Sequence, residues 1–497
     1  MAARFRPTLA ALWTFLAIAL PTLAALLAPM PAVDLAYQLR AGGEILNSGA
    51  IPTVDTWTYT IAGSAWTDQQ WGAQVLLAIA YRAAGWSGLA ILRAGLVALA
   101  FGLLLLVVRR RNPGLAARRQ ALFVLGAFAV AAPALALRPQ LFAIVLFAAT
   151  LLILADRRAH PRRLWLIPIL TLAWANLHGS FPLVLVVLGI AVLGDLLDRG
   201  EWRISLTVSV VSALATFLNP FGLDVWGYVV RLATNPTIGS RVSEWRPPSL
   251  TDPAGIVFWV SVVAVALAVA ALWRQRRSFP IPALLTLVAF GALAALTGRG
   301  LAWWPFAAVF VLSGLLPASL PARSTAFEQR PSALNGVLMG VLVLAGVALL
   351  PFWRPTGPAG VPLGTLSYAP QGIASHLAQI DTTFTSIGPR VWAPQHWGSW
   401  LELEAPHYTY AVDSRIELFP ASVWAEYDAV ETGTTACPAA LGRYDVALVV
   451  TEAETDAALE TALSRAGWAR VFTDADGSIW GRLGDWIGLT APAACTP

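Results

Sequence analysis

A succession of long apolar segments, separated by short connections that often carry arginine, is the feature that most restricts the fold of this chain. A membrane-spanning helix needs about 20 predominantly apolar residues, although tightly packed spans can be shorter. Hydrophobic residues make up 57% of the 497 residues and charged residues only 12%, whereas soluble domains carry about 25% charged residues. We therefore predict an α-helical polytopic membrane protein with about eleven spans, at residues 9–28, 87–108, 120–137, 141–155, 164–177, 181–197, 204–218, 254–273, 280–297, 303–316 and 332–352.

The arginines predict the orientation of these spans. When the spans are threaded alternately through a membrane, 18 arginines lie on the side of the N-terminus, and 8 lie on the opposite side or at the membrane edges before residue 354. Cytoplasmic loops are enriched in basic residues, so the N-terminus is expected in the cytoplasm. An odd number of spans then places the C-terminal part outside the cytoplasm. The first apolar run resembles a signal peptide but has no clean cleavage site, and we interpret it as a retained helix.

The chain divides into a transmembrane domain, residues 1–353, and an extracytoplasmic soluble α/β domain, residues 354–497. Two outer loops, 29–86 and 219–253, are long, as loops that carry function often are. Within the soluble domain we expect strands at 445–450, 468–473 and 478–482 and a helix at 452–466. This domain has no glycine-rich phosphate loop and no nucleophile elbow, so catalysis is not expected there. Whether Cys437 and Cys495 form a disulfide is left open.

Asp34 is the first candidate for chemistry, because it directly follows the first predicted span. A carboxylate at that depth can act as a general base or bind a divalent cation. The alternative is an ordinary helix N-cap, since aspartate is favoured there and the next residues look helical. Segment 71–84 is apolar but short and contains Arg82, so we expect an interfacial helix rather than a span.

Further polar residues gather on the predicted outer side. Guanidinium groups match phosphate oxygens bidentately, so arginines facing a cavity would suit a lipid phosphate; the alternative is snorkelling to the head groups. A lone histidine could contact substrate or metal, or be structural. The candidates for substrate binding in this group are Arg138, Gln140, Asn176, His178, Glu244, Arg246 and Arg299. Arg93 lies within the second predicted span, where a charge is costly unless it faces polar surroundings, so it is a further candidate for the cavity.

The first outer loop interleaves aromatic residues with carboxylates and amides. Aromatic faces beside polar groups suit a sugar, but they equally form the aromatic belt of a membrane interface, and both interpretations stay open. The residues are Trp57, Tyr59, Trp66 and Trp71 with Asp55, Asp68, Gln69 and Gln70. Of these, Trp66 and Asp68, together with Arg40 earlier in the loop, are candidate substrate-binding residues.

A set of short segments recurs in order along nearly the whole chain as a recognisable pattern. They are the loop from Asp34 to Leu46 with Gly49–Pro52, Asp55, Trp57–Thr60, Gly63, Trp66 and Trp71, then Arg138-Pro139-Gln140, Asn176-Leu177-His178-Gly179, Asn219-Pro220-Phe221-Gly222, Glu244-Trp245, Trp397-Gly398-Ser399-Trp400 and Asp413-Ser414-Arg415. In these segments the chain resembles the GT-C superfamily of membrane glycosyltransferases, and within it largely uncharacterised bacterial members grouped with the RgtA/B/C/D-like and protein-mannosyltransferase-like enzymes.

The resemblance implies a glycosyltransferase in a bacterial inner membrane. Such enzymes move a sugar from a polyprenyl-phosphate carrier to an extracytoplasmic glycan, lipid or protein acceptor. By analogy, Asp34 would be the catalytic base, and Arg138, Arg246 or Arg299 would stabilise the departing phosphate, with inversion at the sugar. Leu35 stands where mannosyltransferase-like members have a second acidic residue, so the use of a divalent cation such as Mg²⁺ or Mn²⁺ is left open.

Two other functions fit the same residues. One is a non-catalytic membrane scaffold or glycan-binding protein with this fold, and the other is a lipid-linked glycan ligase or polymerase. The expected partners are the lipid-linked donor, membrane lipids and an acceptor. Nucleic acid is not expected, because the arginines lie in short clusters between apolar runs and form no basic stripe. The donor sugar, the acceptor, the role of the C-terminal domain and the oligomeric state are not readable from the sequence.

Overall fold

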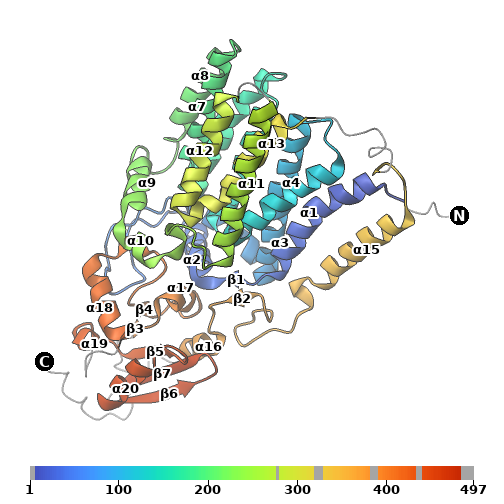
Figure 1. Cartoon of the computed structure of the whole chain (residues 1–497). Coiled ribbons are helices and arrows are strands. Elements are labelled where there is room, and N and C mark those ends of the chain that lie inside the picture. The colour runs from blue at the N-terminus through green and yellow to red at the C-terminus, as the bar shows by residue number, and fades with distance from the viewer. Residues whose placement is uncertain (1–5, 276–278, 318–327, 381–389, 433–438, 483–497) are drawn as a thin grey trace. The chain divides into compact units, whose positions relative to one another are not determined.

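The computed structural model describes residues 6–275, 279–317, 328–380, 390–432 and 439–482. Contacts divide the chain into two compact units, each described by itself below (Figure 1). Unit 1 comprises residues 1–28 and 87–353, and unit 2 comprises residues 29–86 and 354–497. The first long loop thus belongs with the C-terminal residues. Cys437 and Cys495, whose pairing the sequence leaves open, lie outside the described residues.

Unit 1 is helical, and each predicted span coincides with one of its helices. The apolar helices begin and end within a few residues of the predicted limits, because the loops between them carry the proline, glycine and arginine that interrupt the apolar runs. The helices of unit 1 are α1 (Leu9–Leu27), the second part of α3 (Trp71–Arg111), α4 (Ala117–Ala131), α5 (Pro139–Ala155), α6 (Leu166–Leu177), α7 (Pro182–Leu197), α8 (Trp202–Ala215), α9 (Asp224–Thr234), α10 (Pro236–Arg241), α11 (Pro253–Gln275), α12 (Ile281–Leu296), α13 (Trp304–Leu315) and α15 (Ala333–Ala348).

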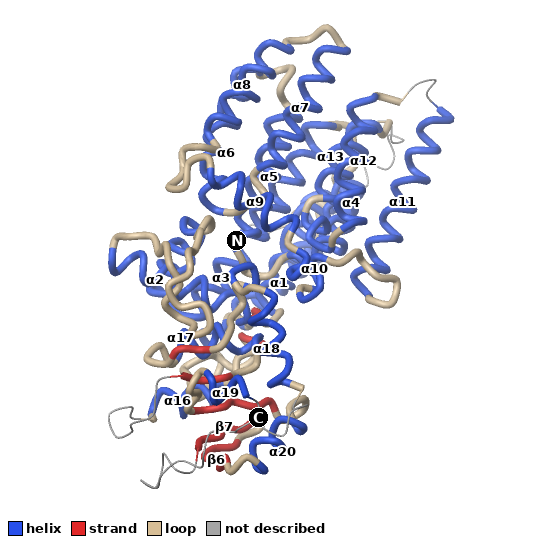
Figure 2. The backbone as a smooth tube through the Cα atoms, turned by 90° about the vertical axis from the view of Figure 1, so that its left-hand side faces the viewer, coloured by secondary structure: helices blue, strands red, loops and turns tan. Residues whose placement is uncertain are grey.

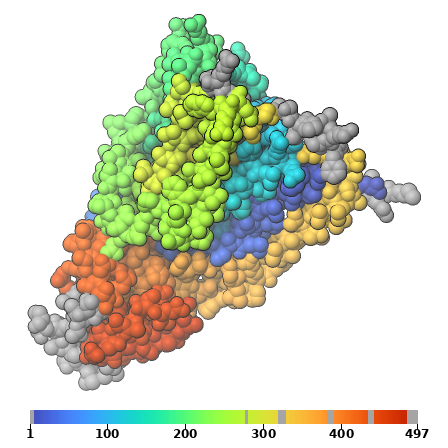
Figure 3. Space-filling view, in the orientation of Figure 1, coloured from blue at the N-terminus to red at the C-terminus, as the bar shows by residue number. Residues whose placement is uncertain are grey.

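Three of these helices, α1, α3 and α11, are long and apolar enough to cross a membrane. Six more apolar helices have 10–17 residues: α5, α7, α8, α12, α13 and α15. The outer face of α11, green-yellow in Figure 3, exposes Val260, Val263 and Leu267 at 57–67%. Such a surface is stable in lipid but costly in water, so the membrane prediction explains it.

A break inside α3 separates its two parts. Ala84 has φ −152° and ψ 21°, and Gly85 has φ +57°, in the positive-φ region that glycine occupies without steric cost. The segment that the sequence marks as an interfacial helix therefore ends where predicted, and the spanning part follows. The first part packs closely on α2 (Ala32–Ser48): a Cβ on Gly42 would lie 2.1 Å from the carbonyl oxygen of Gln74.

Unit 2 contains a mixed five-stranded sheet, seen at the bottom of Figure 2, with strand order β4-β3-β5-β7-β6. Strand β3 pairs in parallel with β4 and β5, while β7 pairs antiparallel with β5 and β6. The strands are β3 (Arg390–Trp392), β4 (Thr409–Tyr410), β5 (Leu448–Glu452), β6 (Trp468–Thr473) and β7 (Gly477–Arg482), and the helices are α2, the first part of α3, α16 (Gln371–Gln379), α17 (Gln395–Glu404), α18 (Ala421–Glu431), α19 (Ala439–Arg443) and α20 (Ala457–Arg465). The predicted strand-helix-strand-strand order of residues 445–482 matches β5, α20, β6 and β7.

The first loop and the C-terminal part of unit 2 are joined by backbone pairing. Strands β1 (Met30–Pro31) and β2 (Leu366–Ser367) pair in parallel. The amide of Tyr59 donates to the carbonyl oxygen of Tyr410 (3.0 Å), and the amide of Tyr410 donates to the carbonyl oxygen of Trp57 (3.1 Å). These bonds satisfy backbone groups that a free loop would leave to water.

Candidate functional site

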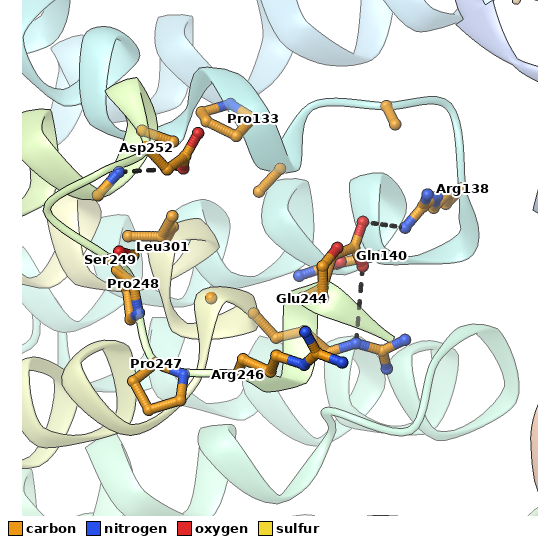
Figure 4. A pocket seen from close by; sticks show the side chains of 17 residues that line it. Pro133, Arg138, Gln140, Glu244, Arg246, Pro247, Pro248, Ser249, Asp252 and Leu301 are labelled. Carbon is orange, nitrogen blue, oxygen red and sulfur yellow. Dashed lines mark hydrogen bonds and ion pairs between the residues drawn. The ribbon is translucent and has the colours of Figure 1, made fainter. Parts of the chain in front are cut away.

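A pocket of about 420 Å³ in unit 1 gathers much of the polar chemistry of that unit. Its walls come from three connections between helices: α4 to α5, the segment before α11, and α12 to α13 (Figure 4). The residues that line it are Pro133, Ala134, Ala136, Arg138, Gln140, Ser243, Glu244, Arg246, Pro247, Pro248, Ser249, Asp252, Ala254, Gly255, Gly298, Arg299 and Leu301.

Proline, glycine and helix ends shape these connections. Arg138 is the N-cap of α5, and Pro139 occupies the first helical position, where its missing N–H costs nothing. Gly300 lies so close to α12 that a Cβ would be 2.3 Å from the Cα of Ala294. The amide of Gly298 donates to the carbonyl oxygen of Arg246 (2.9 Å). The segment before α11 and the connection from α12 to α13 are therefore held together by a backbone hydrogen bond and do not depend on side-chain contacts alone.

Glu244 is the centre of the charged groups in this pocket. Its Oε1 accepts from Nη1 of Arg138 at 2.5 Å, and its Oε2 lies 3.8 Å from Nε of Arg299 (Figure 4). The guanidinium of Arg299 also lies over the ring of Trp245, 4.6 Å from its centroid. The side chains of Arg138, Glu244 and Arg299 are 22–36% exposed, so they can reach a ligand that enters.

The pocket has a surplus of positive charge. Arg246 is exposed, and its Nη2 donates to the carbonyl oxygen of Ser240. Three arginines and two carboxylates, Glu244 and Asp252, line the pocket, which leaves a formal charge of +1. Guanidinium groups suit phosphate or carboxylate oxygens, so the arrangement can bind an anion in exchange for part of the Glu244 contacts.

Other candidates from the sequence lie elsewhere in unit 1. Gln140 lines the pocket and is 8% exposed. Asn176 donates to the carbonyl oxygens of Leu172 (2.9 Å) and Leu218 (3.1 Å), so its amide links two helix ends. His178 follows α6, and its Nδ1 accepts from the amide of Ser180 (3.2 Å). Arg93 is 3% exposed and donates to the carbonyl oxygen of Ala28, the C-cap of α1.

Asp34 lies in unit 2, in the first turn of α2, and is partly buried. The N-cap of α2 is Pro31, so the alternative that Asp34 is an N-cap is wrong. A carboxylate in the first turn is still favoured by the helix dipole. The turn is held from the C-terminal part of unit 2, because Ser414 Oγ donates to the carbonyl oxygen of Val33 at 2.5 Å.

A buried ion network lies in the core of unit 2, and we call it the Arg415 cluster: Arg415, Asp55, Asp413, Trp57 and Trp66. Nη2 of Arg415 lies 2.5 Å from both Asp55 Oδ1 and Asp413 Oδ2, and all three side chains are 0% exposed. The guanidinium lies 4.2 Å and 4.5 Å from the ring centroids of Trp57 and Trp66. Trp57 is 1% exposed and Trp66 5%, so neither forms an interfacial belt.

Two further residues predicted for substrate binding lie beside this cluster. Arg40 donates from Nε to Glu44 (3.2 Å) and from Nη1 to the carbonyl oxygen of Glu402 (3.0 Å). Asp68 is 3% exposed and accepts from Nε2 of Gln74 at 2.6 Å. Burial raises the pKa of Asp68 to about 7. A substrate could reach Trp66 or Asp68 only if their neighbours moved.

The sequence did not single out two carboxylates, one in each unit. Asp252 lines the pocket, and its Oδ2 accepts from the amide of Gly255 at 3.3 Å; its place before Pro253, at the start of α11, was the available signal. Glu402 is 0% exposed, and neither of its carboxylate oxygens has a hydrogen-bond partner among the described residues. Burial, with Asp413 nearby, raises the pKa of Glu402 well above its ordinary value.

The described residues contain no group of three or more His, Cys, Asp or Glu side chains arranged to hold a metal ion.

The sequence matches no protein-family model and no curated protein, but the fold has clear neighbours among solved structures. The archaeal oligosaccharyltransferase AglB from Archaeoglobus fulgidus, in complex with an inhibitory peptide and a dolichol-phosphate, has a TM-score of 0.58 at 14% identity. The match covers 92% of this chain and 71% of AglB. A structure of an Archaeoglobus fulgidus oligosaccharyltransferase in complex with Zn and sulfate has a TM-score of 0.53 at 15% identity, and the match covers 94% of this chain and 73% of that chain.

A bacterial enzyme matches over nearly its whole length. ArnT from Cupriavidus metallidurans in the apo state has a TM-score of 0.52 at 17% identity, and the match covers 94% of this chain and 96% of ArnT. AglB and ArnT are membrane glycosyltransferases of the GT-C superfamily. At these identities the likeness concerns the fold, and at that level the resemblance stated from the sequence is confirmed.

Proposed function

We propose that this chain, which has the fold of GT-C membrane glycosyltransferases, transfers a sugar from a polyprenyl-phosphate-linked donor to an acceptor outside the cytoplasm. In this proposal the pocket around Glu244 binds the phosphate of the donor, and Asp34 is the general base. The acceptor is a hydroxyl or amide group of a glycan, lipid or protein. The identity of the sugar stays outside the proposal.

The observation that carries the proposal is the convergence of Arg138, Arg246 and Arg299 on one pocket. These arginines come from three separate connections of the chain, and two of them, Arg138 and Arg299, contact Glu244. Snorkelling to head groups would not require three arginines to line one pocket. A phosphate bears the charge and the oxygen geometry that three guanidinium groups bind well. Among the neighbours, the AglB structure contains a dolichol-phosphate and an Archaeoglobus fulgidus oligosaccharyltransferase structure contains sulfate, which supports an anion-binding role for this fold.

The proposed reaction is a direct displacement at the anomeric carbon. The Asp34 carboxylate takes the proton of the acceptor group while the acceptor atom forms its bond to the anomeric carbon. The bond between that carbon and the phosphate oxygen breaks with its electron pair on the phosphate. The arginines of the pocket then stabilise the charge that develops on the leaving phosphate. No redox partner is needed, and the sugar inverts at the anomeric carbon.

The test is transfer of labelled sugar from a panel of polyprenyl-phosphate donors in membranes that contain equal amounts of each variant. Arg246→Gln removes a pocket guanidinium that forms no ion pair with Glu244, and we expect transfer to fall about tenfold or more. Arg231→Gln is the matched control, since Arg231 is an exposed arginine of α9 outside the pocket; transfer should stay within about twofold. Asp34→Asn should lower transfer about 100-fold or more.

The outcomes separate the proposed roles. Equal transfer by Arg246→Gln and Arg231→Gln would remove the pocket from donor binding. Full activity of Asp34→Asn would remove Asp34 from catalysis while leaving the glycosyltransferase class intact. If the wild-type protein transferred no sugar from any donor, the scaffold or glycan-binding alternative would replace the enzyme proposal. Formation of long chains rather than single additions would favour the polymerase alternative.

A further inference from the structure

A second pocket of unit 1, of about 610 Å³, lies at the opposite ends of helices that help to form the first. Helix α5 begins at the pocket around Glu244 and ends at this one, and α12 begins here and ends at the other. A helix of the length of α5 spans about 25 Å. The second pocket is therefore a separate site at the arginine-rich end of the unit.

This pocket combines arginine with apolar walls. Arg110, Arg111, Arg157 and Arg158 line it together with Asp156 and Asp198, which leaves a formal charge of +2. Its remaining walls are largely apolar side chains from the ends of α5, α7 and α13, among them Leu151, Val187 and Phe310. A ligand that fits must offer negative charge to one part of the pocket and hydrocarbon to the other.

Three of the four arginines are already paired. Arg157 binds Asp195 (3.0 Å), whose Oδ2 also accepts from Ser205 Oγ (2.5 Å). Arg158 pairs with Asp198, and Arg110 lies 3.7 Å from Asp156. These pairs hold the rim of the pocket.

Arg111 is the exception, because no carboxylate of the described residues forms an ion pair with it. Its Nε donates to the carbonyl oxygen of Phe310 (3.2 Å), and its guanidinium lies 4.6 Å from the centroid of that ring. Gly314 makes room for it: a Cβ there would lie 2.4 Å from Arg111 Nη2. Both Nη groups are thus held beside the pocket without a hydrogen bond to the described residues, as donors for an anion.

We propose that this pocket binds an anionic phospholipid, with the head-group phosphate on Arg111 and acyl chains along the apolar walls. Basic pockets between membrane helices bind anionic lipids for this reason. The apolar walls favour a lipid over free phosphate, which would leave them unfilled. The site does not depend on the proposed transferase activity.

The test is native mass spectrometry of the full chain in detergent, titrated with dioleoyl phosphatidylglycerol, dioleoyl phosphatidylcholine or inorganic phosphate. We expect phosphatidylglycerol to bind more tightly than phosphatidylcholine. Arg111→Gln should weaken phosphatidylglycerol binding about fivefold, as expected for loss of one arginine contact. The control Arg119→Gln removes an exposed arginine near the start of α4, at the same end of unit 1 but outside the pocket, and should leave binding unchanged. Arg111→Lys should retain most of the binding, because the charge is kept.

Three results would overturn the proposal. The first is equal binding of the two lipids, since charge would then play no part. The second is binding of inorganic phosphate in competition with phosphatidylglycerol, which would identify free phosphate as the ligand. The third is an equal loss in Arg111→Lys and Arg111→Gln, which would show that packing of Arg111 matters and its charge does not.

Discussion

Arg415 binds Asp55 across 360 residues of sequence, with Nη2 of the arginine 2.5 Å from Oδ1 of the aspartate. Both side chains are fully buried, so each charge depends on the other for compensation. Burial by itself lowers the pKa of Arg415, but Asp413, Glu402 and Asp55 raise it, and the net result lies above the ordinary value. Arg415 therefore stays protonated inside unit 2.

Replacement of Arg415 by Met should destabilise unit 2 strongly, because it leaves Asp55 and Asp413 buried without a cation. Breaking a buried pair typically costs about 3–5 kcal/mol. Thermal unfolding or limited proteolysis of the purified protein measures the loss. The control is Arg443→Gln, whose exposed pair with Glu426 should contribute about 1 kcal/mol or less. Equal effects of the two changes would contradict a structural role for the Arg415 cluster.

Asp68 should make the stability of unit 2 fall as the pH rises from about 4 to about 7. Burial raises its pKa from an ordinary 3.8 to about 7, although Gln74 and Arg415 act in the opposite direction. In this range the folded protein holds a proton that the unfolded chain has lost, so each rise in pH favours unfolding. Above pH 7 the slope disappears.

Asp68→Asn isolates this contribution, because Glu402 and Glu404 also have raised pKa values. The amide keeps the oxygen that accepts from Gln74, and the variant should gain stability over the wild type at pH 8 but not at pH 4. The pH dependence of the unfolding midpoint is the measurement. Asp445→Asn, at a carboxylate that is 66% exposed, serves as control; the same pH profile in both variants would exclude Asp68 as the source.

Glu244→Gln should tighten the binding of the donor phosphate in the proposed site. The carboxylate competes with phosphate for Arg138 and Arg299, and an uncharged amide competes less. If the guanidinium groups stay in place, we expect the KM for the donor to fall several-fold. This corresponds to a gain in binding free energy on the order of 1 kcal/mol. Donor titrations of the transfer assay check this. An increase in KM would instead assign to Glu244 a contact with the substrate or an essential role in positioning Arg138.

Gly300→Ala should disturb the connection that carries Arg299. The added Cβ would meet backbone atoms of Ala294 at 2.3 and 2.4 Å, and backbone cannot move aside as a side chain does; overpacking of this kind costs about 1–3 kcal/mol. Gly340→Ala is the matched control, since nothing lies within 4 Å of a Cβ at that position in α15. The unfolding midpoint of each variant in detergent gives the answer, and a neutral Gly300→Ala would show that α12 can shift.

Local patterns predicted the apolar helices of unit 1 and the strands of residues 445–482, because apolar periodicity and turn residues act within a few residues of each other. They did not predict α9 and α10, which lie in the segment 219–253 that was expected to be a loop. They could not predict the pairing of Met30 with Leu366 or of Asp55 with Arg415, since no periodicity reports contacts between distant segments. Trp57 illustrates the point. Its neighbours in sequence suggested a sugar or a membrane interface, whereas its neighbours in space are Arg415 and Trp66.

The pocket around Glu244 could likewise be predicted only in part from the sequence. Arg138, Arg246 and Arg299 could be named because they interrupt apolar sequence on the side expected to lack arginine. Their convergence on one pocket, and the presence of Glu244 and Asp252 beside them, depends on how three connections pack. Gly298 and Gly300 set that packing through backbone contacts, which hydropathy does not record.

Unit 2 is built from two separate stretches of the chain, residues 29–86 and 354–497, and this affects its biosynthesis. At about 5–20 residues per second, a ribosome needs roughly 20–70 s to make the 360 residues between Asp55 and Arg415. During that interval the newly made first loop has neither the guanidinium that neutralises Asp55 nor the strand that pairs with Met30. The loop therefore lacks these partners until translation has passed Arg415, and a nascent chain that stops earlier leaves Asp55 without the guanidinium.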